Sequence, residues 1–300
     1  MSTPIRTHAL GKRFRRVVAL DRVDLAVEEG SVYALIGANG AGKTTLIKML
    51  MNIMAPTSGS AELWGVDSRK LGVEQMAQIG YVSENQEMPG WMTVARLLAF
   101  CKPFYPTWDD NVAQELVKQF ALPLDRPLKH LSRGMRMKAA LVSSLACRPK
   151  LIMLDEPFSG LDPLVRDEFS QGLLERAANA TVFISSHDLT EIETFASHIG
   201  YLDNGRLQFS EELRTLYERC REVELTLESP VSLPQPWPAE WLHPESSPAL
   251  VRFLDTRFDD RNTPARLRAL FPNAKDIAVR ALSLRDIFVA LAKSSRKVAA

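Results

Sequence analysis

A short apolar run followed at once by a glycine-rich loop constrains the fold more than any other feature of this sequence. The run is Val32–Ile36, "VYALI", and the loop reads "GANGAGKTT". Gly37, Gly42, Lys43 and Thr44 match the pattern G-x-x-x-x-G-K-[ST], in which backbone N–H groups curl around a phosphate. The apolar residues that follow recur with helical spacing, so a helix should begin at the loop. This order predicts an α/β fold with a mostly parallel sheet, whereas a chance glycine-rich turn needs no such neighbours.

The loop supplies both a positive charge and a metal ligand for a nucleotide. Lys43 can place its ammonium on the β- and γ-phosphates, and the Thr44 hydroxyl can ligate Mg²⁺. The glycines let backbone N–H groups turn inward, because no side chain blocks them. The loop residues that we expect to contact the nucleotide are Gly37, Ala38, Asn39, Gly40, Ala41, Gly42, Lys43, Thr44 and Thr45.

Two later apolar runs end in residues suited to catalysis. "LIMLD" leads into Asp155 and Glu156, and it is typical of a buried parallel strand whose carboxyl end binds ligands. Asp155 can hold Mg²⁺ through water, and Glu156 can polarise the water that attacks the γ-phosphate. An exposed acidic pair is the alternative, but the four apolar residues before the acids argue against it. "TVFISS" ends at His187, which either contacts the same phosphate or water or is merely structural.

The segment "HLSRGMRMKAAL" predicts a helix with an unusually basic start. Ser132 and Gly134 at the beginning of a helix suit an anion, because the first backbone N–H groups are free to donate. Arg133, Arg136 and Lys138 add positive charge, and no acidic residue lies near them in the chain. The sequence therefore predicts an anion site here.

Composition limits the partners and the compartment. The formal net charge of +1 over 300 residues does not support binding to nucleic acid or to an acidic membrane surface. Cys101, Cys147 and Cys220 lie far apart, so we expect no disulfide framework and no zinc site, in a reducing cytoplasm. The N-terminus has no apolar stretch of signal-peptide length, and no run approaches the roughly 20 apolar residues that cross a bilayer.

The chain divides unevenly into a large and a small domain. Residues 1–220 are dense in periodic elements, and Asn204-Gly205 predicts a tight hairpin near their end. Six of the 18 prolines fall in 230–248, which we interpret as a linker or irregular loop because proline disrupts helices and central strands. "EVELTLE" alternates like a half-buried strand, and "SLRDIFVALAK" is typical of an amphipathic helix capped by Ser283. Residues 221–300 are therefore expected to form a small α+β domain.

Together the motifs resemble those of the ATP-binding cassette family, the ATPase subunits of ABC transporters. The phosphate loop is followed, in the family's order, by "LSRGM", "LIMLDEP", "SGLD" and "SSHD", and the resemblance covers about residues 5–220. It implies a P-loop NTPase cassette with a mostly parallel sheet core, an antiparallel β subdomain and a helical subdomain at about 85–140. It also implies ATP and Mg²⁺ as cofactors, with Glu156 and His187 catalytic and Asp162 of "SGLD" at the nucleotide.

The resemblance offers an explanation for the basic helix. In that family two cassettes pack head to tail, and the signature, Leu131–Met135 in this chain, caps the γ-phosphate held by the other cassette. Ser132 and the Gly134 backbone would then meet ATP in trans, most simply in a homodimer. Family members of this type drive separate, exporter-like integral membrane permease subunits from the cytoplasmic face of the cell membrane.

The sequence departs from the family pattern in two places. In the signature, Arg133 replaces a glycine and Met135 replaces a glutamine; Arg133 either pairs with phosphate or points to solvent. Glu84 stands where the family usually has a glutamine that contacts the metal and links to the membrane subunit. A carboxylate can still ligate Mg²⁺ as a hard oxygen donor. Gln86 is the alternative ligand if this loop is longer than usual.

Aromatic residues leave two interpretations open. Phe14 matches the aromatic on which the family stacks adenine, and a core phenylalanine is the alternative. Five aromatic residues fall within 91–108, where they either pack in a core or form a groove for a helix of the membrane partner.

Other functions fit less well. A soluble cassette acting on nucleic acid or ribosomes usually carries a long coiled coil or two cassettes, and this chain has one phosphate loop and little room between it and the signature. A GTPase requires the guanine-reading Asn-Lys-x-Asp, which is absent. We therefore expect an ATPase coupled to transport.

Overall fold

The computed structural model describes residues 3–177, 180–230 and 233–298. The chain forms two compact units, Met1–Ser210 and Glu211–Ala300. The sequence suggested a boundary near 220, about ten residues later. The difference arises because the helix α8 (Leu213–Arg219) belongs to the second unit, where Arg219 Nη1 donates to the Thr256 carbonyl at 2.7 Å.

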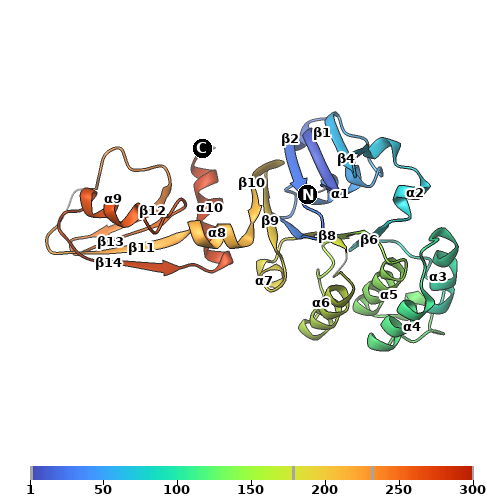
Figure 1. The fold of residues 1–300 in the computed structure, drawn as a ribbon. Helices are drawn as coiled ribbons and strands as arrows, with labels where there is room; N and C mark the ends of the chain where they lie inside the picture. Colours follow the sequence, from blue (N-terminus) through green and yellow to red (C-terminus); the bar gives the residue numbers. More distant parts are fainter. Residues whose placement is uncertain (1–2, 178–179, 231–232, 299–300) are drawn as a thin grey trace. The chain divides into compact units, whose positions relative to one another are not determined.

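A six-stranded sheet forms the centre of the first unit, in the order β10-β9-β3-β8-β7-β6 (Figure 1). Pairing is parallel from β6 through β7, β8 and β3 to β9, as the strand–loop–helix unit predicted. The runs "LIMLD" and "TVFISS" are the strands β7 and β8, and every residue of both is buried. The strands are β3 (Val32–Ile36), β6 (Ile79–Ser83), β7 (Leu151–Asp155), β8 (Thr181–Ser186), β9 (His198–Asp203) and β10 (Arg206–Glu212).

A second, four-stranded sheet in the order β2-β1-β4-β5 is antiparallel, as the cassette fold implies. Its strands are β1 (Ile5–Phe14), β2 (Val17–Val27), β4 (Ser58–Leu63) and β5 (Val66–Asp67). The helix α1 (Lys43–Leu50) shares one core with both sheets: Ile5 of β1, Leu46 of α1 and Phe183 of β8 are each fully buried in it. The phosphate loop that begins α1 is therefore held between two sheets. The short elements η1 (Ser68–Lys70) and α2 (Val73–Met76) follow.

Helices gather on the other side of the central sheet (Figure 1). They are α3 (Val94–Cys101), η2 (Lys102–Phe104), α4 (Asp110–Gln119), η3 (Leu128–His130), α5 (Arg133–Leu145), α6 (Pro163–Ala177) and α7 (Leu189–Ile192). The helical subdomain thus extends to Leu145, somewhat beyond the predicted 140. Trp91, Phe100 and Phe104 are 65%, 56% and 60% exposed, so core packing is wrong for these three aromatic residues.

The second unit is α+β, as expected, with an antiparallel sheet in the order β12-β13-β11-β14. Its core centres on Trp241, Phe253 and Phe271, all nearly inaccessible to solvent. The predicted alternation holds in β11, and Ser283 accepts from the Asp286 N–H at 3.2 Å as the cap of α10. The elements are β11 (Arg221–Leu227), β12 (Trp241–Ser247), β13 (Leu250–Asp255), α9 (Thr263–Leu270), β14 (Ala274–Ala281) and α10 (Leu284–Val298).

The proline-rich segment 230–248 is not wholly irregular, which corrects the sequence-based interpretation. Residues 231–232 lie outside the described ranges, but β12 occupies the end of the segment and contains Pro244. This strand lies at the edge of its sheet, and its register with β13 shifts between Leu242 and Glu245. An edge strand tolerates proline at such an irregularity because no partner needs the missing N–H.

Candidate functional site

The phosphate loop connects β3 to α1 through two glycines that no other residue can replace. Gly42 caps α1 with φ = 111°, and a Cβ there would lie 2.5 Å from the Ala19 carbonyl oxygen. A Cβ on Gly37 would collide with the Leu202 carbonyl oxygen. The loop is therefore close-packed against β2 and β9, and its backbone conformation is fixed before any ligand arrives.

Lys43 holds a buried positive charge at this loop. Its side chain is 5% exposed, and Nζ donates to the carbonyl oxygens of Gly37 at 2.5 Å and Ala38 at 3.3 Å. Its only charged partner in the described residues is Glu156, whose Oε1 lies 2.9 Å from Nζ. One carboxylate and two carbonyls satisfy an ammonium that can equally well bind phosphate oxygens.

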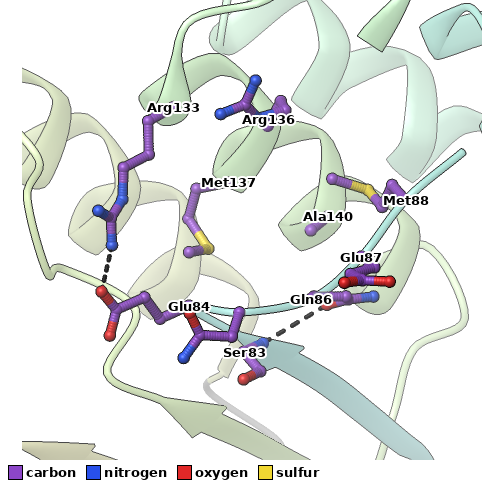
Figure 2. Close-up of a pocket in the computed structure, with 10 residues that line it drawn as sticks. Ser83, Glu84, Gln86, Glu87, Met88, Arg133, Arg136, Met137 and Ala140 are labelled. Carbon is purple, nitrogen blue, oxygen red and sulfur yellow. Dashed lines mark hydrogen bonds and ion pairs between the residues drawn. The ribbon is translucent and has the colours of Figure 1, made fainter. Parts of the chain in front are cut away.

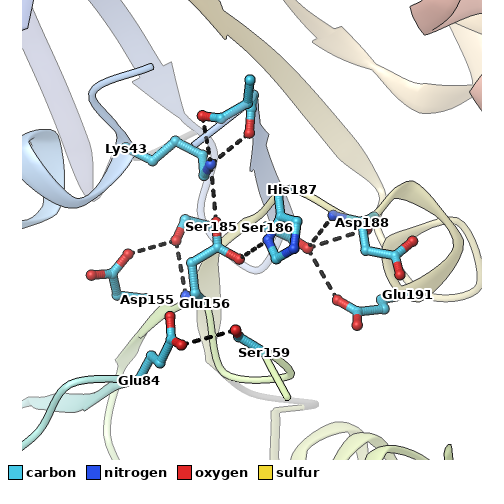
Figure 3. Close-up of polar contacts among 12 residues, drawn as sticks. Lys43, Glu84, Asp155, Glu156, Ser159, Ser185, Ser186, His187, Asp188 and Glu191 are labelled. Atoms are coloured by element: carbon cyan, nitrogen blue, oxygen red, sulfur yellow. Dashed lines mark hydrogen bonds and ion pairs between the residues drawn. The ribbon is translucent and has the colours of Figure 1, made fainter. Parts of the chain in front are cut away.

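Three neighbouring parallel strands deliver the other polar residues to the same edge (Figure 3). Glu84 follows β6, Asp155 ends β7 and Glu156 follows it, and His187 follows β8. Backbone bonds fix their spacing: the Glu84 N–H donates to the Asp155 carbonyl at 2.9 Å, and the Glu156 N–H donates to the Ser185 hydroxyl at 3.0 Å. The structure thus brings together the acids and histidine expected from the sequence.

Asp155 is the buried carboxylate of the cluster, at 3% exposure. Its Oδ1 accepts from the Thr44 hydroxyl at 3.0 Å and from the Ser185 hydroxyl at 2.7 Å. Burial raises the pKa of Asp155, although these hydroxyl bonds act in the opposite direction. A buried carboxylate beside a hydroxyl is a hard-oxygen donor set that a divalent cation would stabilise. The described residues hold no group of three or more His, Cys, Asp or Glu suited to a metal, so Mg²⁺ would need phosphate or water ligands as well.

Glu156 contacts two nitrogen-bearing side chains, Lys43 and His187. Its Oε2 lies 2.7 Å from His187 Nδ1, and its backbone has φ = 51°, a conformation that costs energy for a residue with a side chain. Glu156 is 11% exposed and His187 is 43% exposed, so the pair faces outward from the strand ends. The carboxylate is therefore held between an ammonium and an imidazole.

The signature begins α5, and two of its residues have structural roles. The Ser132 hydroxyl accepts from the Met135 N–H at 3.2 Å and so caps the helix. A Cβ on Gly134 would lie 2.9 Å from Val165 Cγ1, so this glycine lets α5 pack closely against α6. Ser132 remains exposed, whereas Gly134 is buried.

Two of the three basic residues of this helix have acidic partners, which corrects the expectation that their charges are unanswered; the third, Arg136, donates to the Leu131 carbonyl at 3.2 Å. Arg133 pairs with Glu84, and Lys138 pairs with Glu168. Arg133 thus does not simply point to solvent, because it pairs with a carboxylate of the same chain, and its contact with phosphate stays a prediction. These partners are 49 and 30 residues away in the chain, beyond the reach of local sequence patterns.

The remaining predicted residues lie around this cluster. Gln86 turns back to accept from the Ser83 N–H at 3.4 Å, whereas Glu84 accepts from the Ser159 hydroxyl at 2.9 Å. Asp162 accepts from the Val165 N–H at 3.1 Å at the start of α6. Phe14 is 42% exposed, which argues against a core role, and the Lys12 ammonium lies 5.2 Å from its ring centroid.

Sequence reasoning missed two serines of the site. The Ser185 hydroxyl donates to Asp155 and accepts from the Glu156 N–H. The Ser159 hydroxyl donates to Glu84. Ser185 lies in the quoted "TVFISS", at the end of the strand next to β7. That position was the available signal, because residues at the ends of adjacent parallel strands meet.

Comparisons with known proteins agree on one family. A family model described as "ABC transporter" matches residues 20–159. The ABC transporter ATP-binding protein YtrB of Bacillus subtilis is 30% identical over 216 residues, which cover 71% of this chain and 74% of YtrB. The bacitracin transport ATP-binding protein BcrA of Bacillus licheniformis is 33% identical, covering 69% of each chain.

Solved structures show the same fold. The ATP-binding subunit of an ABC transporter matches with a TM-score of 0.65 and 28% identity, over 71% of this chain and 92% of that one. A dimeric ATP-binding cassette bound to ADP and Pi matches with a TM-score of 0.62 at 22% identity, over 70% and 99%.

These relatives favour transport over the alternative of a soluble ATPase acting on nucleic acid or ribosomes. Among the described residues, no helix combines the length and apolarity that a bilayer crossing demands. The family-model match lies within the unit that carries the phosphate loop, the three strand ends and the signature. The chain therefore belongs to the ATP-binding subunits of ABC transporters, and it binds and hydrolyses ATP.

Proposed function

We propose that two copies of this chain enclose two ATP molecules and drive separate integral membrane subunits from the cytoplasmic face of the cell membrane. In each site the phosphate loop of one copy would face the signature of the other. The observation that carries the catalytic part of this proposal is the Glu156 carboxylate, held 2.9 Å from Lys43 Nζ and 2.7 Å from His187 Nδ1.

Glu156 acts as the general base in this proposal. Lys43 is released when phosphate oxygens take over its charge, and the freed carboxylate oxygen can then accept a proton from the attacking water. His187 keeps the other oxygen oriented through its 2.7 Å contact, and in this proposal it also contacts the γ-phosphate. Both side chains come from neighbouring strand ends, which keeps the pair aligned.

Thr44 and Asp155 are the proposed Mg²⁺ residues, with Glu84 as a further ligand. The 3.0 Å contact between the Thr44 hydroxyl and Asp155, together with the burial of that carboxylate, supports this assignment. Mg²⁺ would neutralise charge on the phosphates as the bond to the γ-phosphate breaks. Phe14 would stack on adenine, and Asp162 would lie near the nucleotide through the loop that starts α6.

The start of α5 supports the arrangement in trans. Its first turn contains no acidic residue, and Ser132 and Arg133 are exposed there. The helix dipole and the free N–H groups favour an anion at this end. The ATP bound by the same chain would lie at its phosphate loop, which precedes α1. The start of α5 is therefore left for the ATP of the second copy.

A pocket of about 400 Å³ between the loop after β6 and α5 supports a membrane partner (Figure 2). Its walls combine Met88, Met137 and Ala140 with the charges of Glu87 and Arg136. Such a mixture suits an amphipathic helix, with apolar side chains in the pocket and charged ones at its rim. We assign this surface to the membrane subunit.

Mixing two defective variants tests the trans arrangement. Lys43→Ala damages the phosphate loop, whereas Ser132→Asp keeps the helix cap but repels the γ-phosphate, because aspartate is also a good N-cap. In a mixed dimer both lesions fall in one site, and the other site is intact. We expect neither variant alone to trap ATP and the mixture to recover trapping in the mixed species.

Ser132→Asn is the matched control, because it caps the helix without adding charge. It should trap ATP nearly as well as the parent protein. If Ser132→Asp alone forms ATP-driven dimers and hydrolyses ATP normally, the trans arrangement is wrong. Absence of rescue on mixing would exclude a homodimer with two complementary sites.

A further inference from the structure

The ion pair between Glu84 and Arg133 joins three segments of the first unit (Figure 2). Glu84 Oε1 accepts both from Arg133 Nη2 and from the Ser159 hydroxyl at 2.9 Å, so the loop after β6, the start of α5 and the loop after β7 meet at one oxygen. The guanidinium lies over Gly160, where a Cβ would come within 3.0 Å of Nη1. The pair is therefore seated in a defined place, unlike most exposed ion pairs.

This contact decides where the Glu84 carboxylate can act. The Glu84 backbone is tied to the end of β7 by its 2.9 Å bond to the Asp155 carbonyl. Only the side chain can move, and Figure 3 shows it turned toward Ser159. Arg133 and Ser159 both donate to Oε1, so they orient the carboxylate and occupy one of its two oxygens. The ion pair therefore competes with a metal beside Thr44 and Asp155 for the charge and the orientation of this carboxylate.

Arg133 is in turn open to a stronger partner. It is the first residue of α5 and is 43% exposed, whereas Glu84 is 26% exposed. A guanidinium keeps its charge and binds phosphate through two parallel hydrogen bonds. A triphosphate carries more negative charge than one carboxylate, so a phosphate brought to the start of α5 competes effectively for Arg133.

We propose that Arg133 exchanges between Glu84 of its own chain and the γ-phosphate of the ATP held by the second copy. The exchange releases Glu84 for the metal in its own site, so ATP captured at one site prepares the other. Arg133 is then a positioning residue for Glu84 as well as a phosphate contact. This inference rests on the two-copy arrangement proposed above.

The exchange predicts opposite effects for the two partners of the ion pair. Glu84→Gln frees Arg133 in advance, so the ATP concentration that half-saturates dimer formation should fall by about two- to fivefold. Arg133→Ala removes the phosphate contact, so that concentration should rise by about tenfold or more. Arg133→Lys keeps the positive charge but cannot form two parallel hydrogen bonds to phosphate, so its half-saturating ATP concentration should lie between those of the parent and Arg133→Ala. A purely structural ion pair would weaken dimer formation in the same direction whichever partner was removed.

The measurement is ATP-driven dimer formation of the full chain by analytical ultracentrifugation, in a Glu156→Gln background that prevents turnover. The double variant Glu84→Gln/Arg133→Ala completes the cycle: once Arg133 is absent, Glu84→Gln should no longer lower the half-saturating ATP concentration. Arg148→Ala is the matched control, since Arg148 is an exposed arginine that forms an ion pair with Asp109 beyond the C-terminal end of α5. It should behave like the parent.

The outcomes separate this inference from the one it rests on. If the parent does not dimerise with ATP at all, the two-copy arrangement fails and the exchange fails with it. If the parent dimerises but Glu84→Gln and Arg133→Ala shift the ATP dependence in the same direction, only the exchange is overturned. The exchange is also overturned if Glu84→Gln changes the half-saturating ATP concentration equally with and without Arg133.

Discussion

Replacing Glu156 by glutamine should destabilise the protein without ATP and stabilise its ATP-bound form. Glu156 is the only charged partner of Lys43 among the described residues, and Lys43 is 5% exposed. Removing one member of a buried pair costs about 3–5 kcal/mol when the other charge is left uncompensated. Glutamine retains an acceptor oxygen and the Gly37 and Ala38 carbonyls remain, so we expect a loss of about 1–3 kcal/mol in the free energy of unfolding.

ATP should cancel this loss, because its phosphates provide Lys43 with new negative partners. The variant should also hydrolyse ATP about 10²–10⁴-fold more slowly, the range typical for loss of a general base. Urea denaturation with and without Mg-ATP measures the first effect, and single-turnover hydrolysis measures the second. The stability gained from ATP should be larger for Glu156→Gln than for the parent protein.

Glu191→Gln provides a matched control, because Glu191 is a nearby carboxylate with no contact to Lys43. It is 8% exposed and pairs with Arg166 at 2.7 Å. Its loss should cost stability equally with and without ATP. If Glu156→Gln is as stable as the parent without ATP, the buried charge of Lys43 is not stabilised by Glu156. If the variant hydrolyses ATP within about tenfold of the parent rate, Glu156 is not the general base.

Three further outcomes are expected. A chain ending after Glu212 keeps all of β10 and should bind ATP with unchanged affinity in an equilibrium titration; failure to fold would show that the second unit completes the first. Burial raises the pKa of Cys147 to about 12 and that of Cys220 to about 11, so mass spectrometry should find neither alkylated by iodoacetamide until the chain unfolds. The Arg69 side chain lowers the pKa of Asp67 from 3.8 to about 2, so the ion pair contributes stability above pH 3.8 that is lost as the pH falls towards 2; Asp67→Asn should show a smaller loss over that range in acid denaturation.

The parts of the site that lie on buried strands could be predicted from the sequence. "LIMLD" and "TVFISS" are almost continuous apolar runs because both faces of a central parallel strand are buried. This pattern does not depend on which elements cover the two faces. The residues after such strands meet at one edge of the sheet. This rule brings Glu156 and His187 together, whereas Glu84 was expected near them only through the resemblance to the cassette family.

Contacts that depend on pairing between distant helices and loops could not be predicted in this way. Arg133 and Glu84 have no local pattern that connects them, and neither do Lys138 and Glu168. The strand that contains Pro244 was missed for a related reason. Proline is excluded from central strands but not from edges, and strand order is a property of the whole sheet.

The strand order of the central sheet also affects how the protein is made. β3, which leads into the phosphate loop, lies between β8 and β9, and the Gly205 N–H after β9 donates to the Ala41 carbonyl at 3.1 Å. A ribosome releases β3 long before either neighbour, and domains generally fold as units once their chain has emerged. During synthesis the apolar "VYALI" therefore stays without its two neighbouring strands until β8 and β9 have emerged, and over that interval its apolar side chains are exposed. The nucleotide site becomes complete only after β9 and the turn at Gly205 have been translated, close to the end of the first unit.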